Sequence, residues 1–562
     1  MLVLITCNRY NRVYNEDNTE GLEGVFVKYR KILAVLLCVS MLVPCLAGCG
    51  KSMEDLAEVP AMQELMAEAD ARRSAILSSE TAIVKDSTAV PGETYTGRAW
   101  YISNNGNDKN NGKSPEKALA TLKGLEQKNV KPGDAVFFER GGLWRGEQVL
   151  WIENLTYSAY GEGEKPKLYA SSENGSGAEK WSLHYEGEKG EKIWLFYQDM
   201  AECGGIVLNG NTMAEREYAF WDNGNWIKLD SLHPGAASGT VFRVEEHLKD
   251  MTFFADIIFD ESWNPAENAH CRWDEATQQN IYPVGKLYLR CDAGNPGELY
   301  SDIEFLQPYT FFDGLPNGTV LDNLNISYCG TNLNTGGGDE NGPSHDGVIQ
   351  NCEFGWSGGA VGDYRTLADY PDERHVFPGD GGLAILGSNY TVRNNYIHHA
   401  YYCGLMVDAM NEFVDVENLT LSGNLIEKNL NGIILNNWGE HGRMFRNFKV
   451  EDNFVFACGE EEFTYYLPEQ DLATAFYFRG DLCPSENLTV QNNTFALAKK
   501  AIVTTDKYLE EYRHVFSGNT YAQYPMAGGI RMTLSENNLP LNEKNLLQYF
   551  GDAAPTIIEL KK

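Results

Sequence analysis

Acidic, amide and basic side chains recur at one equivalent position of several short apolar segments, each led by Gly or Ala. From the first segment to the last, this position holds Asp363, Leu386, Asp408, Asn436, Arg479 and Thr505. If the segments are stacked strands, Asp363 and Asp408 lie two strands apart, with about 9.6 Å between their backbones. Their carboxyl groups would then be about 5 to 10 Å apart, the range over which paired carboxyls cleave a glycosidic bond. Asp380, beside the intermediate strand, is the alternative for either role.

Aromatic and polar residues near this column could hold the substrate of such a reaction. They are Trp356, Tyr401, Tyr402, Trp438 and His441 in the flanking loops, and Asn436 and Arg479 in the column itself. A long loop, 364–379, could form one wall of a cleft beside them. We therefore expect these residues to bind substrate in a groove along the column. The competing interpretation is an ordinary solvated strand face.

A repeated Asn defines the elements that would position these residues. Seven stretches share an apolar residue, two mostly polar residues, an Asn and a second short apolar run. The seven Asn residues are Asn323, Asn351, Asn395, Asn424, Asn453, Asn493 and Asn519, which are 26 to 44 residues apart by subtraction. This recurrence predicts a solenoid of stacked coils. We expect the Asn side chains to hydrogen-bond one another as a structural ladder and not to form a site.

The opening of the folded region carries a family resemblance. Its motifs are WYIS (100–103), NGND (105–108), KPGD (131–134) and GGLWRG (141–146). They resemble the capping coil of bacterial right-handed parallel β-helix proteins of the pectate-lyase-like superfamily, and the resemblance extends over about 98–170 and 303–530. It implies an all-β, right-handed parallel β-helix solenoid similar to β-helix glycoside hydrolases. Many members of the superfamily act on carbohydrates.

Six regions are expected along the chain. Residues 1–48 are interpreted as a signal peptide, 49–97 as an anchor with a helical spacer and linker, and 98–171 as the N-terminal cap and first coils. Residues 172–302 lack the Asn repeat and resemble the β-sandwich-like domain that related hydrolases insert into a β-helix. The main coils with the candidate site occupy 303–530, followed by a C-terminal cap, 531–562.

The N-terminus predicts export. Three basic residues within 28–31 precede an apolar run, 32–47, which is too short for an ordinary transmembrane helix. The run ends in LAGC (46–49), which resembles a bacterial lipoprotein signal in which the Cys is lipidated. We therefore expect an exported, cell-surface lipoprotein that is anchored to the bacterial membrane through Cys49.

The charge of the chain limits its partners. A formal net charge of −33 argues against nucleic acid, because phosphate binding needs clustered Lys and Arg. The same charge disfavours strongly anionic glycans unless a bound cation intervenes. We expect a poly- or oligosaccharide substrate, membrane contact through the N-terminal lipid, a monomeric state and no required cofactor.

Two other functions fit the same residues. A polysaccharide lyase of this superfamily would hold calcium and use a basic residue, here Arg479, to abstract a proton; its ligands would be Asp363, Asp408, Glu412 and Asp415. The groove lacks the additional basic residues expected to grip a uronate chain, so hydrolysis is favoured. The third function is a noncatalytic glycan-binding adhesin, because a fold does not fix a function.

Cysteine and histidine give two further expectations. Cys271 and Cys291 flank strand-like segments of an exported domain and are expected to form a disulfide, whereas most other cysteines are expected to pack in the core. His398 and His399 are adjacent in sequence. Because consecutive strand residues point to opposite faces, we do not expect them to share a metal ion.

Overall fold

The computed structural model describes most of the chain from residue 58 onward. The described ranges are 58–80, 83–146, 150–198, 203–222, 225–229, 237–257, 272–274, 279–281, 285–307, 312–330, 333–335, 343–359, 381–409, 415–438, 444–460, 473–482, 485–506, 515–524, 531–534 and 537–561. The predicted signal peptide and Cys49 lie outside them.

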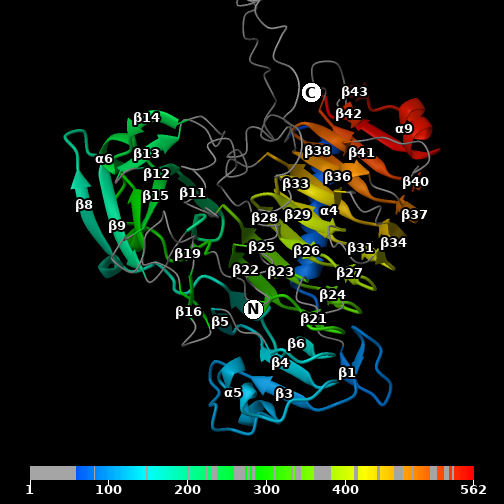
Figure 1. The fold of residues 1–562 in the computed structure, drawn as a ribbon, viewed down its shortest axis with the longest axis horizontal. Helices are drawn as coiled ribbons and strands as arrows, with labels where there is room; N and C mark the ends of the chain where they lie inside the picture. The colour runs from blue at the N-terminus through cyan, green and yellow to red at the C-terminus, as the bar shows by residue number, and fades with distance from the viewer. Residues whose placement is uncertain are drawn as a thin grey trace, which may run out of the picture. The chain divides into compact units, whose positions relative to one another are not determined.

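Three long sheets, named sheets 1, 2 and 3, form the body of the described residues (Figure 1). Sheet 1 contains, in spatial order, β3 (Ala99–Ile102), β4 (Ala135–Glu139), β6 (Thr156–Tyr160), β21 (Val320–Asp322), β24 (Val348–Gln350), β27 (Thr391–Arg393), β31 (Thr420–Ser422), β34 (Phe445–Glu451), β37 (Ser485–Gln491) and β40 (Val515–Ser517), and β30 (Val416–Glu417) also pairs with β34. Sheet 2 contains β5 (Leu143–Arg145), β7 (Lys167–Tyr169), β22 (Asn325–Cys329), β25 (Glu353–Ser357), β28 (Tyr396–Ala400), β32 (Leu425–Glu427), β35 (Phe454–Cys458), β38 (Thr494–Ala498), β41 (Thr520–Gln523) and β44 (Thr556–Glu559). Sheet 3 contains β20 (Phe312–Asp313), β23 (Leu333–Asn334), β26 (Leu383–Ile385), β29 (Cys403–Asp408), β33 (Asn431–Trp438), β36 (Thr474–Leu482), β39 (Ala501–Thr505), β42 (Arg531–Leu534) and β43 (Asn537–Pro540).

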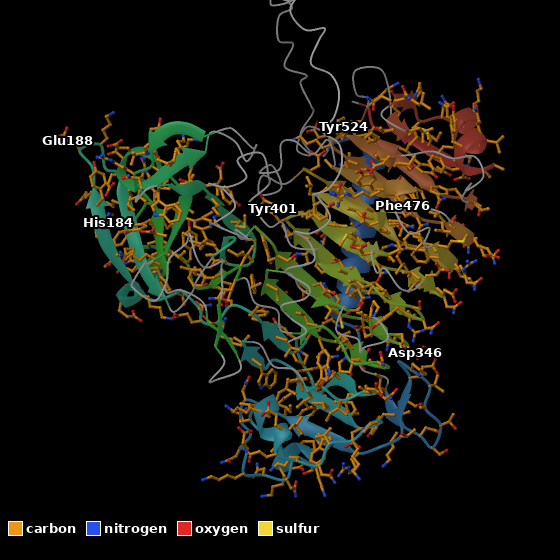
Figure 2. All side chains as sticks on the ribbon, in the orientation of Figure 1. His184, Glu188, Asp346, Tyr401, Phe476 and Tyr524 are labelled. Carbon is orange, nitrogen blue, oxygen red and sulfur yellow. The ribbon has the colours of Figure 1, made fainter. Side chains whose placement is uncertain are left out.

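Each coil of the body passes through sheet 1, sheet 2 and sheet 3 in turn. The strands β27, β28 and β29 form one coil, and each pairs in parallel with the equivalent strand of the next coil. Alternate residues point inward, so Val392, Ile397 and Leu405 are fully buried in one continuous core. Phe476, labelled in Figure 2, belongs to the same core. The prediction of an all-β parallel β-helix is therefore confirmed.

One coil carries a large insertion between sheet 2 and sheet 3, because the chain leaves the β-helix after β7 and returns at β20. Its larger sheet has the order β19 (Ile303–Phe305), β10 (Ile206–Leu208), β11 (Thr212–Arg216), β15 (Thr252–Ile257), β18 (Gly285–Arg290), β9 (Lys192–Gln198) and β8 (Trp181–Glu186). Smaller sheets pair β12 (Ala219–Asp222), β13 (Asn225–Leu229) and β14 (Ala237–Val241), and β16 (Arg272–Asp274) with β17 (Gln279–Ile281). Ile193 and Phe254 of the larger sheet pack with Ala219 of a smaller one, as in a β-sandwich.

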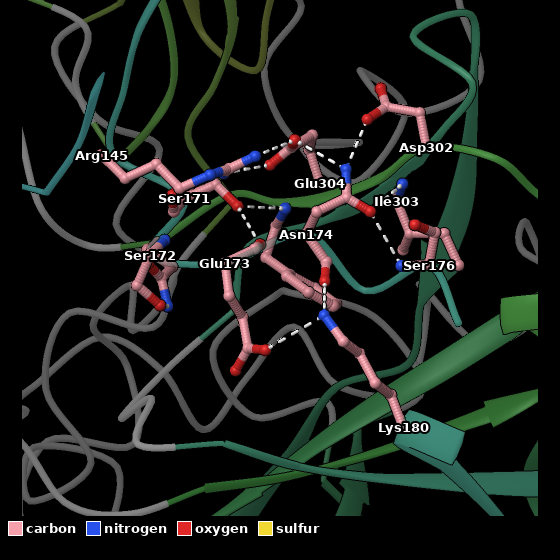
Figure 3. Close-up of polar contacts among 12 residues, drawn as sticks. Arg145, Ser171, Ser172, Glu173, Asn174, Ser176, Lys180, Asp302, Ile303 and Glu304 are labelled. Carbon is pink, nitrogen blue, oxygen red and sulfur yellow. Dashed lines mark hydrogen bonds and ion pairs between the residues drawn. The ribbon is translucent and has the colours of Figure 1, made fainter. Parts of the chain in front are cut away.

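A buried ion pair fixes the root of the insertion (Figure 3). Arg145 of β5 donates two hydrogen bonds, of 2.6 and 2.7 Å, to the carboxylate of Glu304 in β19. The Glu304 side chain is 1% exposed, and the Asn174 amide donates to the same carboxylate over 3.0 Å. Removing either charged partner would leave an uncompensated buried charge. Because Arg145 belongs to the β-helix and Glu304 to the insertion, the ion pair holds the two together.

The predicted N-terminal helix forms as α4 (Pro60–Leu77), but it is not a free spacer. Figure 1 shows α4 in blue running across the strands of the β-helix. Met62, Leu65, Ala69 and Ile76 are buried against the outer face of sheet 2, where they meet residues from β28, β32, β35, β38 and β41. Arg73 also donates two hydrogen bonds, of 2.9 and 2.8 Å, to the buried carboxylate of Glu427.

The remaining described helices and strands are short. They are η2 (Pro115–Lys117), α5 (Leu122–Glu126), η3 (Ala178–Lys180), α6 (Val244–His247), α7 (Pro296–Leu299) and α9 (Glu543–Phe550), with the paired strands β1 (Val84–Lys85) and β2 (Thr94–Tyr95) before the first coil. Across the described ranges, no helix combines the length and the apolar character that a membrane span needs.

A buried Asn ladder runs between sheets 1 and 2. Along it each side-chain amide donates to the side-chain oxygen of the next coil, over 2.9 to 3.0 Å, from Asn395 through Asn424, Asn453 and Asn493 to Asn519. Asn519 then donates to Asp552. The prediction is wrong for Asn323 and Asn351, because the first two repeats are offset by one residue. Cys352 occupies the ladder position of its coil and donates its backbone N–H to Asn395.

A second Asn ladder lies on the surface and was not predicted. Asn418 donates to Asn389, Asn447 to Asn418, and Asn487 to Asn447, over 2.8 to 3.1 Å. All four residues have φ between 52° and 61°. Asn tolerates this left-handed conformation better than most residues, which explains its recurrence at the turn.

One expectation about reactive side chains is wrong, and the physical argument behind another does not hold. Cys291 is a buried free thiol, so the predicted disulfide with Cys271 is not formed; Cys271 itself lies outside the described residues. His398 and His399 do not diverge, because His399 has a φ of 51° and their Nδ1 atoms are 2.7 Å apart. One ring must donate and the other accept, so the two histidines form a hydrogen-bonded pair. The expectation that the buried cysteines pack in the core is confirmed for Cys329, Cys352 and Cys458.

Candidate active site

The outer face of sheet 3 carries the predicted polar column. Asp408 of β29 pairs with Asn436 of β33, and Asn436 pairs with Arg479 of β36. The three residues therefore lie on consecutive coils in the predicted order. The residues next to them in the same strands point inward and are fully or almost fully buried in the core. Because successive strand residues point to opposite faces, the column points outward.

This column is more buried than an ordinary outer strand face. Asp408 and Asn436 are each 3% exposed, and Arg479 is half-buried. Met406, Ile434 and Tyr477 form an adjacent outer column that is also buried, in a cluster with Tyr401 and Tyr402. A carboxylate that is buried to this extent is partly shielded from water, which strengthens its interaction with any charge that develops nearby.

Tyr402 joins the aromatic cluster to the polar column. The Arg479 guanidinium donates to the Tyr402 hydroxyl and lies 5.6 Å from the centroid of its ring. Tyr402 precedes β29, whereas Arg479 lies in β36, so the contact crosses the outer face of sheet 3. The predicted residues Tyr401, Tyr402, Asp408, Asn436 and Arg479 are thus brought together on this face.

Asp506 continues the column, and sequence reasoning missed it. Phe478 pairs with Thr505, so the partner of Arg479 is Asp506 and the predicted position of Thr505 is wrong by one residue. Asp506 accepts hydrogen bonds from the Tyr477 hydroxyl, over 2.5 Å, and from the Gly480 N–H, over 2.8 Å. Burial, together with this neighbouring carboxylate, raises the pKa of Tyr477 above its ordinary value. Tyr477 therefore remains a neutral hydrogen-bond donor.

The predicted spacing of Asp363 and Asp408 assumes that their segments are strands two coils apart in sheet 3. The strand pairing contradicts this assumption. The strand that precedes β26 in sheet 3 is β23, with Leu333 paired to Leu383. The segment that begins at Gly359 therefore belongs to the connection between β25 and β26 within a single coil, and not to a coil of its own. Asp363 and Asp380 come between β25 and β26 in sequence and are outside the described residues.

Trp356 lies on sheet 2 and not beside the column. Its ring stacks on His399 with centroids 4.0 Å apart and packs with Tyr169 and Tyr328. Trp438 is the last residue of β33 and pairs with Leu482, but its side chain is not among those described. Glu412 and His441 lie outside the described residues.

Asp415 has a different environment from Asp408. Its carboxylate accepts from the Met444 N–H over 3.0 Å and from Arg446 over 3.2 Å, at the edge of sheet 1. In the part of the chain that the structure describes, no three His, Cys, Asp or Glu side chains gather in a way that could hold a metal ion. The calcium site expected for a lyase stays a prediction that depends on Asp363 and Glu412.

Comparison with known proteins yields only distant likenesses. No protein-family model and no curated protein matches the chain. Similar solved structures include a complex of XylC with xylose (13% identity, 76% of this chain and 67% of that one, TM-score 0.42). A GH136 lacto-N-biosidase from Eubacterium ramulus is similar at 12% identity, over 82% of this chain and 68% of that one, with a TM-score of 0.37. A structure described as a glycoside hydrolase is similar at 11% identity, over 82% and 96%, with a TM-score of 0.42. Likenesses of this degree do not assign an activity to the chain.

Proposed function

We propose that this protein is a carbohydrate-active enzyme that hydrolyses glycosidic bonds on the outer face of sheet 3. The observation that carries the proposal is the alignment of Asp408, Asn436 and Arg479 on three consecutive coils, beside a cluster of tyrosines. A carboxylate supplies the acid–base or nucleophilic group that hydrolysis needs. Aromatic rings and polar side chains are the groups that bind sugars.

Asp408 is the proposed reacting carboxyl group. It would either protonate the leaving oxygen or attack the anomeric carbon, directly or through a water molecule. Asp363 and Asp380 are the proposed candidates for the second carboxyl, because both belong to the connection that leads into β26, next to β29. The distance between the two carboxyls would decide whether the anomeric configuration is retained or inverted.

Asn436 and Arg479 are proposed to bind sugar hydroxyls next to Asp408. Both can donate hydrogen bonds, and Arg479 is oriented by its contact with Tyr402. A side chain that is held in place before substrate binds loses less conformational freedom on binding. Arg479 is half-buried, so it is more accessible than Asp408 and Asn436.

A polysaccharide lyase is the second candidate, favoured by the presence of Arg479 in the same column as Asp408. In that case Arg479 would abstract a proton, and calcium would neutralise the uronate carboxylate. A chelator would then abolish activity, and the products would absorb in the ultraviolet. Chelator-insensitive release of saturated sugars would instead support hydrolysis.

We also propose that Cys49 anchors the protein to the surface of a bacterial cell, on the strength of the signal at 28–49. Metabolic labelling with a fatty acid should mark the wild-type protein and not a Cys49→Ser variant. Recovery of an unmodified peptide that spans Cys49 from the mature protein would contradict this anchoring.

Turnover of a glycan panel tests the proposed activity directly. The purified chain from residue 58 onward, which includes α4, should release sugars from at least one neutral oligosaccharide, and mass spectrometry would identify the products. Absence of turnover on every glycan, with glycan binding intact, would favour the noncatalytic adhesin.

A further inference from the structure

The inserted domain contacts the β-helix next to the candidate site, at the end of β25. Arg216, the last residue of β11, donates to the carbonyl of Gly359 over 2.9 Å and to that of Cys203 over 2.8 Å. The Tyr218 hydroxyl donates to the same Gly359 carbonyl over 3.1 Å. Two side chains of the insertion therefore hold one backbone group of the β-helix.

The backbones approach closely at this contact. Gly359 has a φ of 80°, and a Cβ atom at that position would lie 2.6 Å from the carbonyl oxygen of Gly204. Only Gly fits such a conformation and such a spacing without displacement of the backbone. The contact thus has a defined geometry, which the insertion could not keep if it slid along the β-helix.

Tyr218 also belongs to the cluster on the outer face of sheet 3. Its side chain is 5% exposed and lies in one continuous cluster of buried residues with Tyr401, Tyr402 and Met406. Met213 and Trp226, also from the insertion, pack on the edge of this cluster. Tyr401 is labelled in Figure 2. The insertion therefore supplies part of the buried cluster that contains Tyr402, whose hydroxyl accepts from Arg479.

We propose that Tyr218 is a positioning residue of the sheet 3 site, acting through Tyr402 on Arg479. The proposal rests on the proposed function and extends it, since it makes the inserted domain part of the active site. Buried side chains are close-packed, so loss of the Tyr218 ring would let the cluster that includes Tyr402 relax into the space it leaves. Arg479 would follow, and small displacements of binding groups reduce catalytic efficiency strongly.

Two substitutions separate the ring of Tyr218 from its hydroxyl. Tyr218→Ala removes the packing, and we expect kcat/KM to fall at least about tenfold on the oligosaccharide that the wild-type enzyme turns over. The loss should be mainly a rise in KM, because the groups displaced are binding groups. Tyr218→Phe removes only the hydrogen bond to Gly359, so its KM should stay within about twofold of the wild-type value.

Val207→Ala is the matched control for weakened packing of the insertion. Val207 lies in β10 and is fully buried with Tyr169, Leu306 and Trp356 at the contact with sheet 2. It is outside the cluster that contains Tyr218 and Tyr402. This variant should lower Tm as Tyr218→Ala does but leave KM unchanged. An equal rise in KM for both variants would mean that any weakening of the insertion disturbs the site, and would overturn the role of Tyr218.

The proposed function and this inference fail in different ways. Wild-type turnover with unchanged kinetics in Tyr218→Ala overturns the inference alone. If the wild type turns over no glycan, the proposed function fails, and dissociation constants on a glycan array then test the inference. Equal dissociation constants for the wild type and Tyr218→Ala, or no binding by either, overturn it.

Discussion

Asp408 and Asn436 are register partners on neighbouring strands of sheet 3, and each is 3% exposed although it points away from the solenoid core. Outer strand residues of a solenoid usually meet solvent, so burial of a carboxylate and an amide together there has a cost in desolvation. Proteins tolerate such a cost chiefly where the groups are satisfied by partners or serve a site. The pair therefore anchors the functional proposal.

The buried Asn ladder should contribute strongly to stability. Asn424 accepts two hydrogen bonds from Asn395 and donates to Val392 and Asn453. Asn424→Ala leaves several of these buried groups unsatisfied, so we expect a loss of about 3 to 5 kcal/mol in the free energy of unfolding. Denaturant titration of the purified protein measures it.

The exposed ladder provides the matched control. Asn418→Gly removes the same kind of side chain at a residue with a φ of 57°, where Gly is tolerated. Because water replaces the lost partners, the change should stay within about 1 kcal/mol. Equal losses for the two variants would contradict the claim that burial makes the inner ladder important.

Docking of α4 should depend on the ion pair between Arg73 and Glu427. The Glu427 side chain is 1% exposed, so Arg73→Met leaves a buried carboxylate without its cation, and we expect a loss of about 3 to 5 kcal/mol. Hydrogen exchange in α4 should accelerate in this variant. Asp70→Asn removes an exposed partner of the same Arg73 and should cost less than about 1 kcal/mol. An α4 that stays equally protected in both variants would argue that apolar packing alone holds the helix.

Acidification should weaken the fold through His399. Burial, with the nearby charges of His398, Lys428 and Arg73, holds the pKa of His399 well below its ordinary value of 6.5. Below about pH 6.5 the unfolded chain therefore binds more protons than the folded one, so stability is lost as pH falls, by up to about 1.4 kcal/mol per pH unit. His399→Asn should flatten the pH dependence of unfolding between pH 6.5 and 5. An unchanged slope in this variant would assign the effect to other groups.

The fold was predictable because its periodicity is strong. Apolar residues at fixed offsets from the Asn of the later repeats identify the inward faces of sheets 1 and 2. Alternating apolar residues identify the inward face of sheet 3, and they predict the adjacency of Asp408, Asn436 and Arg479. The register between coils was less predictable for the first two Asn repeats, which are offset by one residue from the later ones. Asn351 and Asn394 are equivalent in space, but their sequences suggest an equivalence between Asn351 and Asn395.

The site could be predicted where the strands of sheet 3 carry a recognisable apolar pattern, as they do around Asp408, Asn436 and Arg479. The segment that begins at Gly359 matches the sequence pattern of a sheet 3 strand, so the sequence predicts Asp363 in the coil position that β23 occupies. A residue with a left-handed backbone conformation, such as His399, also interrupts the alternation of side chains between the two faces of a strand. The face on which its side chain lies then cannot be predicted from sequence position. Tyr218 is distant in sequence from the column, and no local pattern connects the two.

Replacement of Asp408 is the most direct test of the functional account. Asp408→Asn keeps the shape of the side chain and removes its acid–base and nucleophilic capacity, so turnover should fall about 10²- to 10⁴-fold while glycan binding persists. Asp506→Asn, at the exposed end of the same column, is the matched control and should retain most of the activity. Full turnover by Asp408→Asn on a glycan that the wild-type enzyme cleaves would contradict the account.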